Sequence, residues 1–136
     1  MEMHVRQMFR AEFKVWSERH GYAGTLDLLG LHDDGYVSIF DWATGDPADV
    51  SKDLQTGAYL GAALEMAATD PELAAELRSK GPVVRRRSVR LYRDGRMARE
   101  QLYTDPRDFA KFLTALSLVH DQARRPSPIT GWEEER

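Results

Sequence analysis

Two aspartates stand in apolar segments, where an isolated charge is unfavourable. Asp27 lies between Leu26 and Leu28, and Asp41 follows the apolar run 37–40. An ionised carboxylate in such surroundings is stable only when it is paired or binds a cation. Carboxylate oxygens are suitable ligands for Mg²⁺ or Mn²⁺. Together the two residues predict a divalent-metal site. The alternative for each alone is that it caps backbone amides or pairs with an arginine.

The two aspartates are expected to lie on neighbouring strands of a hairpin. Alternation of apolar and polar residues indicates a first strand over 11–17. Leucine-rich residues 25–31 indicate a second strand, and the β-branched and aromatic residues 36–42 a third. The sequence Asp34-Gly35 is typical of the turn between the last two. If these strands pair around that turn, Asp27 and Asp41 lie near the open end of the hairpin, almost opposite one another.

The segments after the hairpin indicate two helices. Leu54, Ala58 and Ala62 share one helical face, and Gly57 and Gly61 lie beside it. This ridge of small residues predicts a helix that lies close against the sheet. The dipeptide Asp70-Pro71 is typical of a helix start and predicts a short helix over 72–79.

A second hairpin and a last helix complete the predicted domain. Segments 83–92 and 97–103 flank an Asp94-Gly95 turn. The last helix begins at Asp105-Pro106 and carries an apolar stripe of Phe109, Phe112, Leu113, Leu116 and Val119. Of these, we expect Phe109, Phe112 and Leu116 to pack in the core. The order βββααββα predicts an α+β, or mixed α/β, fold. One domain is expected over 1–124, followed by an irregular C-terminal tail over 125–136.

Three short motifs carry a resemblance to a known family. They read Gly24-Thr25-Leu26-Asp27, Asp41-Trp42-Ala43-Thr44-Gly45 and Gln55-Thr56-Gly57-Ala58-Tyr59. Together they resemble the core of RecB-like nucleases of the PD-(D/E)XK superfamily. In that core, Gly-x-x-Asp on one strand precedes Asp-x-Lys-Thr-Gly on the next and Gln-x-x-x-Tyr on a helix. The match covers about residues 12–66, and it implies a restriction-endonuclease-like core, a central mixed sheet flanked by helices.

The resemblance implies metal-dependent hydrolysis of DNA phosphodiester bonds, in phage or prophage DNA processing. Asp27, Asp41 and the carbonyl group of Trp42 would hold Mg²⁺ or Mn²⁺. Gln55 and Tyr59 lie one helical turn apart, so they share a face that could point at the active site or at DNA. The alternative for these two is a solvated glutamine and an aromatic residue at the edge of the core.

The chain departs from the family pattern at two places. Ala43 stands where the family has its catalytic lysine, and a methyl group can neither position nor deprotonate water. We therefore expect an impaired or inactive enzyme, through an engineered or a natural replacement, unless the lysine has migrated to Lys52. The upstream glutamate or histidine ligand of many relatives is also missing, and Glu12 is the first candidate to replace it.

Charge is unevenly distributed along the chain. The formal net charge is -3, yet five arginines fall within 83–93. Arg86 and Arg90, with Lys52, are candidates for contacts to DNA phosphates. The competing interpretation is a solvated strand face.

Composition restricts the setting. The chain has no cysteine and no apolar run near the roughly 20 residues of a membrane span, so we expect a cytoplasmic protein of a bacterial or phage-infected cell. A non-catalytic nuclease-fold protein that binds nucleic acid or a protein partner is the second hypothesis. Left open are the strandedness of the substrate, endo- or exonucleolytic cleavage, and assembly as a homo-oligomer or with a phage or host protein.

Overall fold

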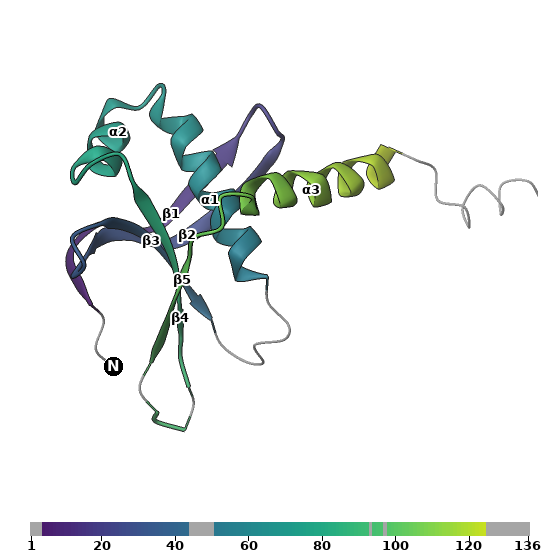
Figure 1. Cartoon of the computed structure of the whole chain (residues 1–136). Coiled ribbons are helices and arrows are strands. Elements are labelled where there is room, and N and C mark those ends of the chain that lie inside the picture. The colour runs from purple at the N-terminus through teal and green to yellow at the C-terminus, as the bar shows by residue number, and fades with distance from the viewer. Residues whose placement is uncertain (1–3, 44–50, 93, 97, 125–136) are drawn as a thin grey trace, which may run out of the picture.

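The strands and helices follow one another in the order predicted from the sequence. The computed structural model describes residues 4–43, 51–92, 94–96 and 98–124. Within these ranges the elements are β1 (Val5–Ser17), β2 (Tyr22–His32), β3 (Val37–Ala43), α1 (Lys52–Ala67), α2 (Pro71–Arg78), β4 (Val84–Arg90), β5 (Arg99–Tyr103) and α3 (Asp108–Arg124) (Figure 1). The fold is therefore of the mixed α+β class, as expected. The predicted tail over 125–136 lies outside the described residues.

The strands form one mixed sheet in the order β1-β2-β3-β4-β5. The first three pair antiparallel as a meander, and β5 pairs antiparallel with β4. β4 runs parallel to β3, because α1 and α2 return the chain to the end where β3 began. The carboxyl end of β3 therefore lies beside the carboxyl end of β4.

The β2–β3 hairpin has the register that was expected. Leu31 pairs with Val37 and Leu28 with Phe40, so the next positions toward the open end are 27 and 41. Gly35 closes the turn with a φ of +89°, a conformation that glycine adopts without strain. The first two strands are longer than predicted: β1 begins at Val5 rather than at 11, and β2 begins at Tyr22 rather than at 25.

The main core lies between the sheet and the first two helices. Its buried residues include Leu29 and Ile39 from the strands, Ala62 from α1 and Leu73 from α2. A smaller cluster of Leu28, Phe40 and Val89 is separate from this core. None of the helices in the described ranges is long and apolar enough to cross a membrane.

α1 lies close against the sheet, as its ridge of small residues predicted, and its glycines in addition accommodate α3. A Cβ atom added at Gly61 would lie 2.4 Å from Cε1 of Phe109, and one at Gly57 would lie 3.3 Å from Cβ of Asp108. The alanines do face the main core, where Ala62 and Ala63 are almost fully buried. The small-residue ridge therefore allows a close helix–helix contact.

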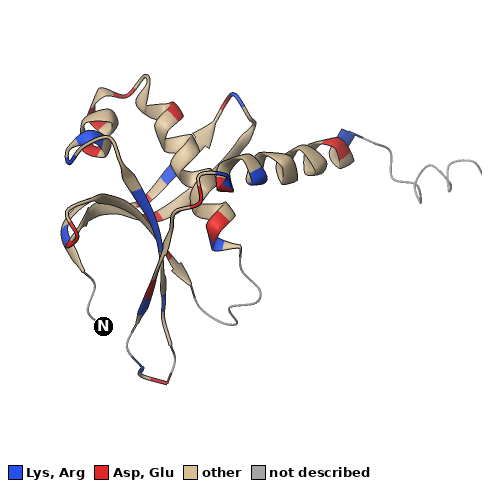
Figure 2. Ribbon diagram, in the orientation of Figure 1, with Lys and Arg blue, Asp and Glu red and all other residues tan. Residues whose placement is uncertain are grey.

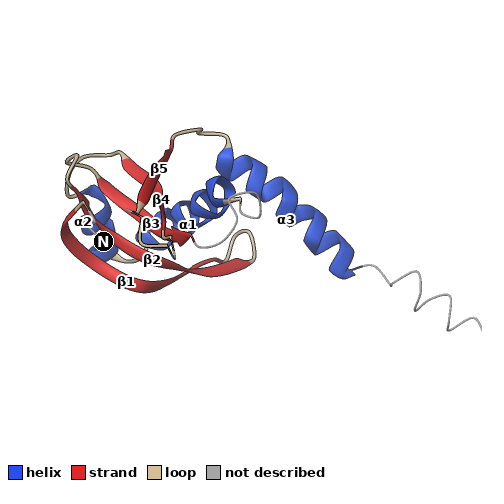
Figure 3. Ribbon diagram, turned by 90° about the horizontal axis from the view of Figure 1, so that it is seen from below, coloured by secondary structure: helices blue, strands red, loops and turns tan. Residues whose placement is uncertain are grey.

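The apolar stripe of α3 packs only over its first half. The ring of Phe112 lies 4.8 Å from that of Tyr22, whereas Leu118 and Val119 are 63% and 59% exposed. Figure 3 shows α3 extending away from the sheet. Val119, the last residue of the apolar stripe, therefore lies outside the core.

Candidate active site

Asp27 and Asp41 meet at the open end of the β2–β3 hairpin. The backbone N–H of Trp42 donates to Oδ2 of Asp27 at 2.7 Å, and the Asp27 carboxyl group lies close enough to Asp41 to raise its pKa. The side chain of Asp41 is only 5% exposed. The structure thus brings together the two aspartates that were predicted as metal ligands. Trp42 contributes its N–H here, whereas the predicted role was for its carbonyl group.

The backbone is irregular around Asp27. Leu26 and Leu29 both belong to the main core, although residues three apart on a regular strand point to opposite faces. β2 therefore changes face between them, and Asp27 lies in that segment. On β1, Glu12 lies between the partners of Leu28 and Leu26, and its φ is +49°, which is uncommon for a residue with a side chain.

This irregularity does not make Glu12 a third ligand in the structure. Its backbone stands across from Asp27, but its side chain is exposed. The described residues contain no group of three or more His, Asp or Glu side chains placed to hold one metal ion. Of the predicted ligand side chains, the structure therefore brings only Asp27 and Asp41 together.

Lys52 reaches the aspartates from the first turn of α1. Its Nζ donates to Oδ2 of Asp41 at 2.5 Å and to Oε1 of Gln55 at 3.1 Å. Nε2 of Gln55 in turn donates to the hydroxyl of Tyr59 at 2.7 Å. The side chains of Asp41, Lys52, Gln55 and Tyr59 thus form one hydrogen-bonded chain. Gln55 and Tyr59 share a face, as their spacing predicted, and that face includes the candidate site.

Ala43 ends β3 two residues beyond Asp41, so it lies on the same face of the strand. It is 2% exposed, and the motif residues that follow it, Thr44 and Gly45, lie outside the described residues. The ammonium group beside Asp41 therefore comes from α1 and not from β3. This position agrees with the hypothesis of a migrated lysine.

Burial and the neighbouring carboxyl group change the acidity of the site. Desolvation, and then the hydrogen bond from Asp27, raise the pKa of Asp41 to about 6, against an opposing effect of Lys52. Burial and the charge of Asp41 also raise the pKa of the Tyr59 hydroxyl. At neutral pH Tyr59 therefore keeps its proton, while Asp41 is ionised against the preference of its surroundings.

These residues fit a divalent cation. Burial is the main cause of the raised pKa of Asp41, and the repulsion between two neighbouring carboxylates adds to it. A cation between them would reverse that effect, because it favours both ionised forms. Asp27 and Asp41 are oxygen donors of the kind that Mg²⁺ and Mn²⁺ select.

Arg86, predicted to contact DNA, is instead buried between β4, α1 and α3. It is 7% exposed, and its guanidinium donates to the carbonyl oxygen of Asp53 at 2.8 Å and to Oδ2 of Asp108 at 2.9 Å. It also donates to Oγ1 of Thr56 and to the carbonyl oxygen of Asp105. With its donors used inside the protein, Arg86 has a structural role, and its assignment to DNA binding is corrected.

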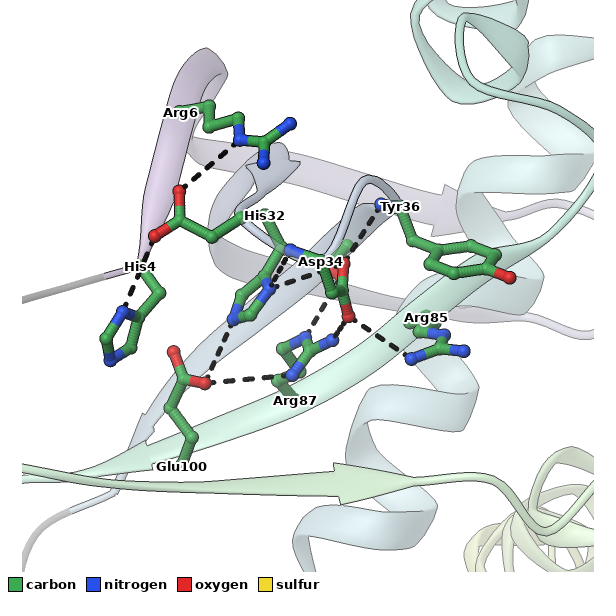
Figure 4. A network of polar contacts seen from close by, with 10 residues as sticks. His4, Arg6, His32, Asp34, Tyr36, Arg85, Arg87 and Glu100 are labelled. Carbon is green, nitrogen blue, oxygen red and sulfur yellow. Dashed lines mark hydrogen bonds and ion pairs between the residues drawn. The ribbon is translucent and has the colours of Figure 1, made fainter.

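Two further arginines of β4 belong to a polar network near the β2–β3 turn (Figure 4). Arg87 donates to Asp34, and Arg85 donates to the same carboxylate at 3.2 Å. Nε2 of His32 lies 3.0 Å from Oε2 of Glu100, which belongs to β5. This network joins the turn to the last two strands, and no pattern in the sequence predicted it.

A pocket of about 640 Å³ adjoins the Asp41–Lys52 pair. It is lined by Lys52 and Asp53 of α1, by Tyr92, which follows β4, and by residues of the last two strands, namely Ser88, Arg90, Arg99, Glu100, Gln101 and Tyr103. Arg90, one of the predicted phosphate contacts, thus lies near the site, and Figure 2 shows basic residues along β4. Sequence reasoning predicted the second hairpin but missed its contribution to the site, because the parallel pairing of β3 with β4, which are far apart in the sequence, brings that hairpin beside Asp41.

Comparison with known proteins adds no family assignment. No protein-family model matches the chain, and no curated protein matches it.

Proposed function

We propose that the chain is a divalent-metal-dependent deoxyribonuclease of the RecB-like PD-(D/E)XK type. The observation that carries this proposal is the buried contact among Asp27, Asp41 and Lys52 at the end of two strands. Two carboxylates and one ammonium group are the charged groups expected at a phosphodiester-hydrolysing centre. The role in phage or prophage DNA processing stays a prediction from the resemblance.

Asp27 and Asp41 would hold Mg²⁺ or Mn²⁺. The cation would supply activation of the attacking water and neutralise charge that develops on the phosphorane-like transition state. The water oxygen forms the new bond to phosphorus, and the bond from phosphorus to the leaving sugar oxygen breaks. The protein residues must therefore position one phosphate group and one water molecule.

Lys52 is placed to do part of this positioning. An ammonium group has three donors, of which Asp41 and Gln55 accept two. The third is available for a phosphate oxygen or for the attacking water. Gln55 fixes the direction of the lysine and also donates to Tyr59. Because Tyr59 keeps its proton at neutral pH, its hydroxyl is a further donor for a phosphate oxygen.

Lys52 thus takes the role that Ala43 cannot fill. The expectation of an inactive enzyme rested on the alanine in the strand, and a lysine from α1 reaches the same carboxylate. A four-carbon side chain makes this change of origin feasible. The alternative function is a non-catalytic nuclease-fold protein that binds nucleic acid or a protein partner. The observation that supports it is the alanine at position 43.

The test is cleavage of single-stranded and linear duplex DNA with Mn²⁺ or Mg²⁺. We expect metal-dependent cleavage by the unaltered chain, and a loss of at least about a hundredfold in Lys52→Met, the scale of general acid–base or electrostatic catalysis. Asp41→Asn is expected to be inactive. Lys14→Met removes an equal charge from an exposed position on β1 and serves as the matched control.

A second variant separates the lysine hypotheses. Ala43→Lys in the Lys52→Met background is expected to restore part of the activity, because both positions adjoin Asp41. Activity that is absent from the unaltered chain but present in Ala43→Lys would contradict the role of Lys52 while supporting the nuclease. No cleavage by either protein, with no Mn²⁺ binding that depends on Asp27 and Asp41, would favour the non-catalytic alternative.

A further inference from the structure

The pocket beside Asp41 and Lys52 lies on the same face of the sheet as the candidate site. Asp41 pairs with Ser88 of β4, and Ser88 pairs with Gln101 of β5. Residues paired across neighbouring strands project to the same face. Ser88 and Gln101 therefore lie beside Asp41 on the same face, and the candidate site continues from Asp41 across β4 and β5.

The next row of this face is basic. Ala43 pairs with Arg90, and Arg90 pairs with Arg99. The row lies two residues along from Asp41, which is roughly 7 Å on an extended strand. Both arginines line the pocket together with Lys52. A chain of phosphates that enters the site at Asp41 would therefore meet a second group of cations about one nucleotide away.

Two carboxylates of the described residues line this pocket, and both have other partners. Glu100 lines the pocket, but its carboxylate interacts with His32 and Arg87 in the network of Figure 4. Asp53 accepts from the backbone N–H of Leu54. Among the described residues, no carboxylate forms an ion pair with Arg99. The pocket is therefore suited to an anionic ligand.

Tyr103 gives the pocket an aromatic surface. Its hydroxyl lies 2.9 Å from Oγ of the buried Ser88, so the ring is held at the edge of the pocket. Its side chain is half-buried, on the same face as the two arginines. A groove that combines cations with an aromatic ring is the usual arrangement for single-stranded nucleic acid, because each unpaired base exposes a face for stacking.

We infer that this pocket binds an unpaired nucleotide next to the phosphate that is cleaved, so that the substrate is single-stranded DNA. The inference rests on the proposed function, because it takes the Asp41 site as the cleavage centre. Arg99 binds the neighbouring phosphate, and Tyr103 stacks on the base. In a duplex the bases are stacked on one another, and none has a face available for Tyr103.

The test measures binding separately from cleavage. The full chain is titrated into a fluorescein-labelled oligodeoxythymidylate in EDTA, and anisotropy reports the affinity. Tyr103→Leu is expected to weaken binding roughly tenfold, the effect of losing one stacked base. Tyr103→Phe keeps the ring and loses only the hydroxyl, so it is expected to bind like the unaltered chain. Urea denaturation of each variant confirms that it is folded.

Salt dependence tests the arginine. Arg99→Ala is expected to weaken binding and to reduce the slope of log K against log salt by about 0.7, the contribution of one phosphate contact on a single strand. Arg78→Ala removes an equal charge from an exposed position on α2 and is expected to keep the slope. A blunt duplex is expected to compete at least tenfold more weakly than the single strand.

The outcomes separate this inference from the nuclease proposal. Equal affinity for duplex and single strand, with no effect of Tyr103→Leu, overturns the inference, even if the protein cleaves DNA with Mn²⁺. Single-strand binding that requires Arg99 and Tyr103 supports the pocket, even if no cleavage is found. Cleavage of the single strand that is weakened by both substitutions supports the inference and the proposed function together.

Discussion

Replacing Asp41 by asparagine is expected to stabilise the metal-free protein at neutral pH. The carboxylate is buried, it contacts Asp27, and Lys52 only partly compensates for these effects. Asparagine has nearly the same shape as the neutral carboxylic acid, and its amide oxygen can still accept from Lys52. The substitution therefore removes an unfavourable charge and keeps the packing.

The size of the effect follows from the pKa of Asp41, which rises from 3.8 to about 6 on folding. This difference of about two pKa units corresponds to about 3 kcal/mol. The folded state holds the proton more tightly, so the free energy of unfolding falls as pH rises from about 4 to above 6. Below pH 4 both states are protonated, and the difference between the two proteins disappears.

Urea denaturation of the metal-free proteins between pH 4 and pH 8 measures this difference. Asp41→Asn is expected to gain up to about 3 kcal/mol relative to the unaltered chain by pH 7. Asp33→Asn, at an exposed position, is the matched control and is expected to show no such trend. Mn²⁺ is expected to stabilise the unaltered chain and not Asp41→Asn. A difference between the two proteins that is independent of pH would refute the reasoning.

Three further outcomes are expected. Asp27→Asn is expected to lower the pKa of Asp41, because the neighbouring carboxyl group raises it, and carbon-13 NMR titration of the side-chain carboxyl measures the change. Arg86→Met leaves Asp108 buried without its cation and is expected to reduce the free energy of unfolding by about 3–5 kcal/mol in urea denaturation. Asp70→Ala removes the side-chain cap of α2 and is expected to reduce the same quantity by about 1 kcal/mol; unchanged stability would contradict the capping role.

Local patterns predicted the elements and the placement of the two aspartates. The turn at Asp34-Gly35 and the alternation of the flanking residues together fix a register, and the register brings position 27 opposite position 41. The N-cap at Asp70 was also predicted, and its side chain accepts from the backbone N–H of Leu73. These features depend on residues close together in the sequence, so local sequence patterns are enough to predict them.

Features that depend on distant segments were not predictable in this way. Arg86 is buried because α1 and α3 both pack over β4, and no sequence pattern predicts that these two helices lie side by side there. The close approach of Phe109 to Gly61 was unpredictable for the same reason, because a ridge of small residues does not determine which helix or strand packs against it. The pocket residues Arg99 and Tyr103 belong to the predicted second hairpin, but they join the site only because β4 pairs parallel with the distant β3.

The position of Lys52 at the start of α1 has a consequence for how the site responds to heat. A cation is least favourable at the positive end of the helix dipole, and Ser51 provides no side-chain hydrogen bond to cap that end. The first turn is thus locally frustrated: it gives up helical stability to hold the ammonium group beside Asp41. Helix ends fray before helix centres, so warming is expected to release the lysine while the sheet remains intact. Activity would then decline at temperatures below the unfolding transition of the whole domain.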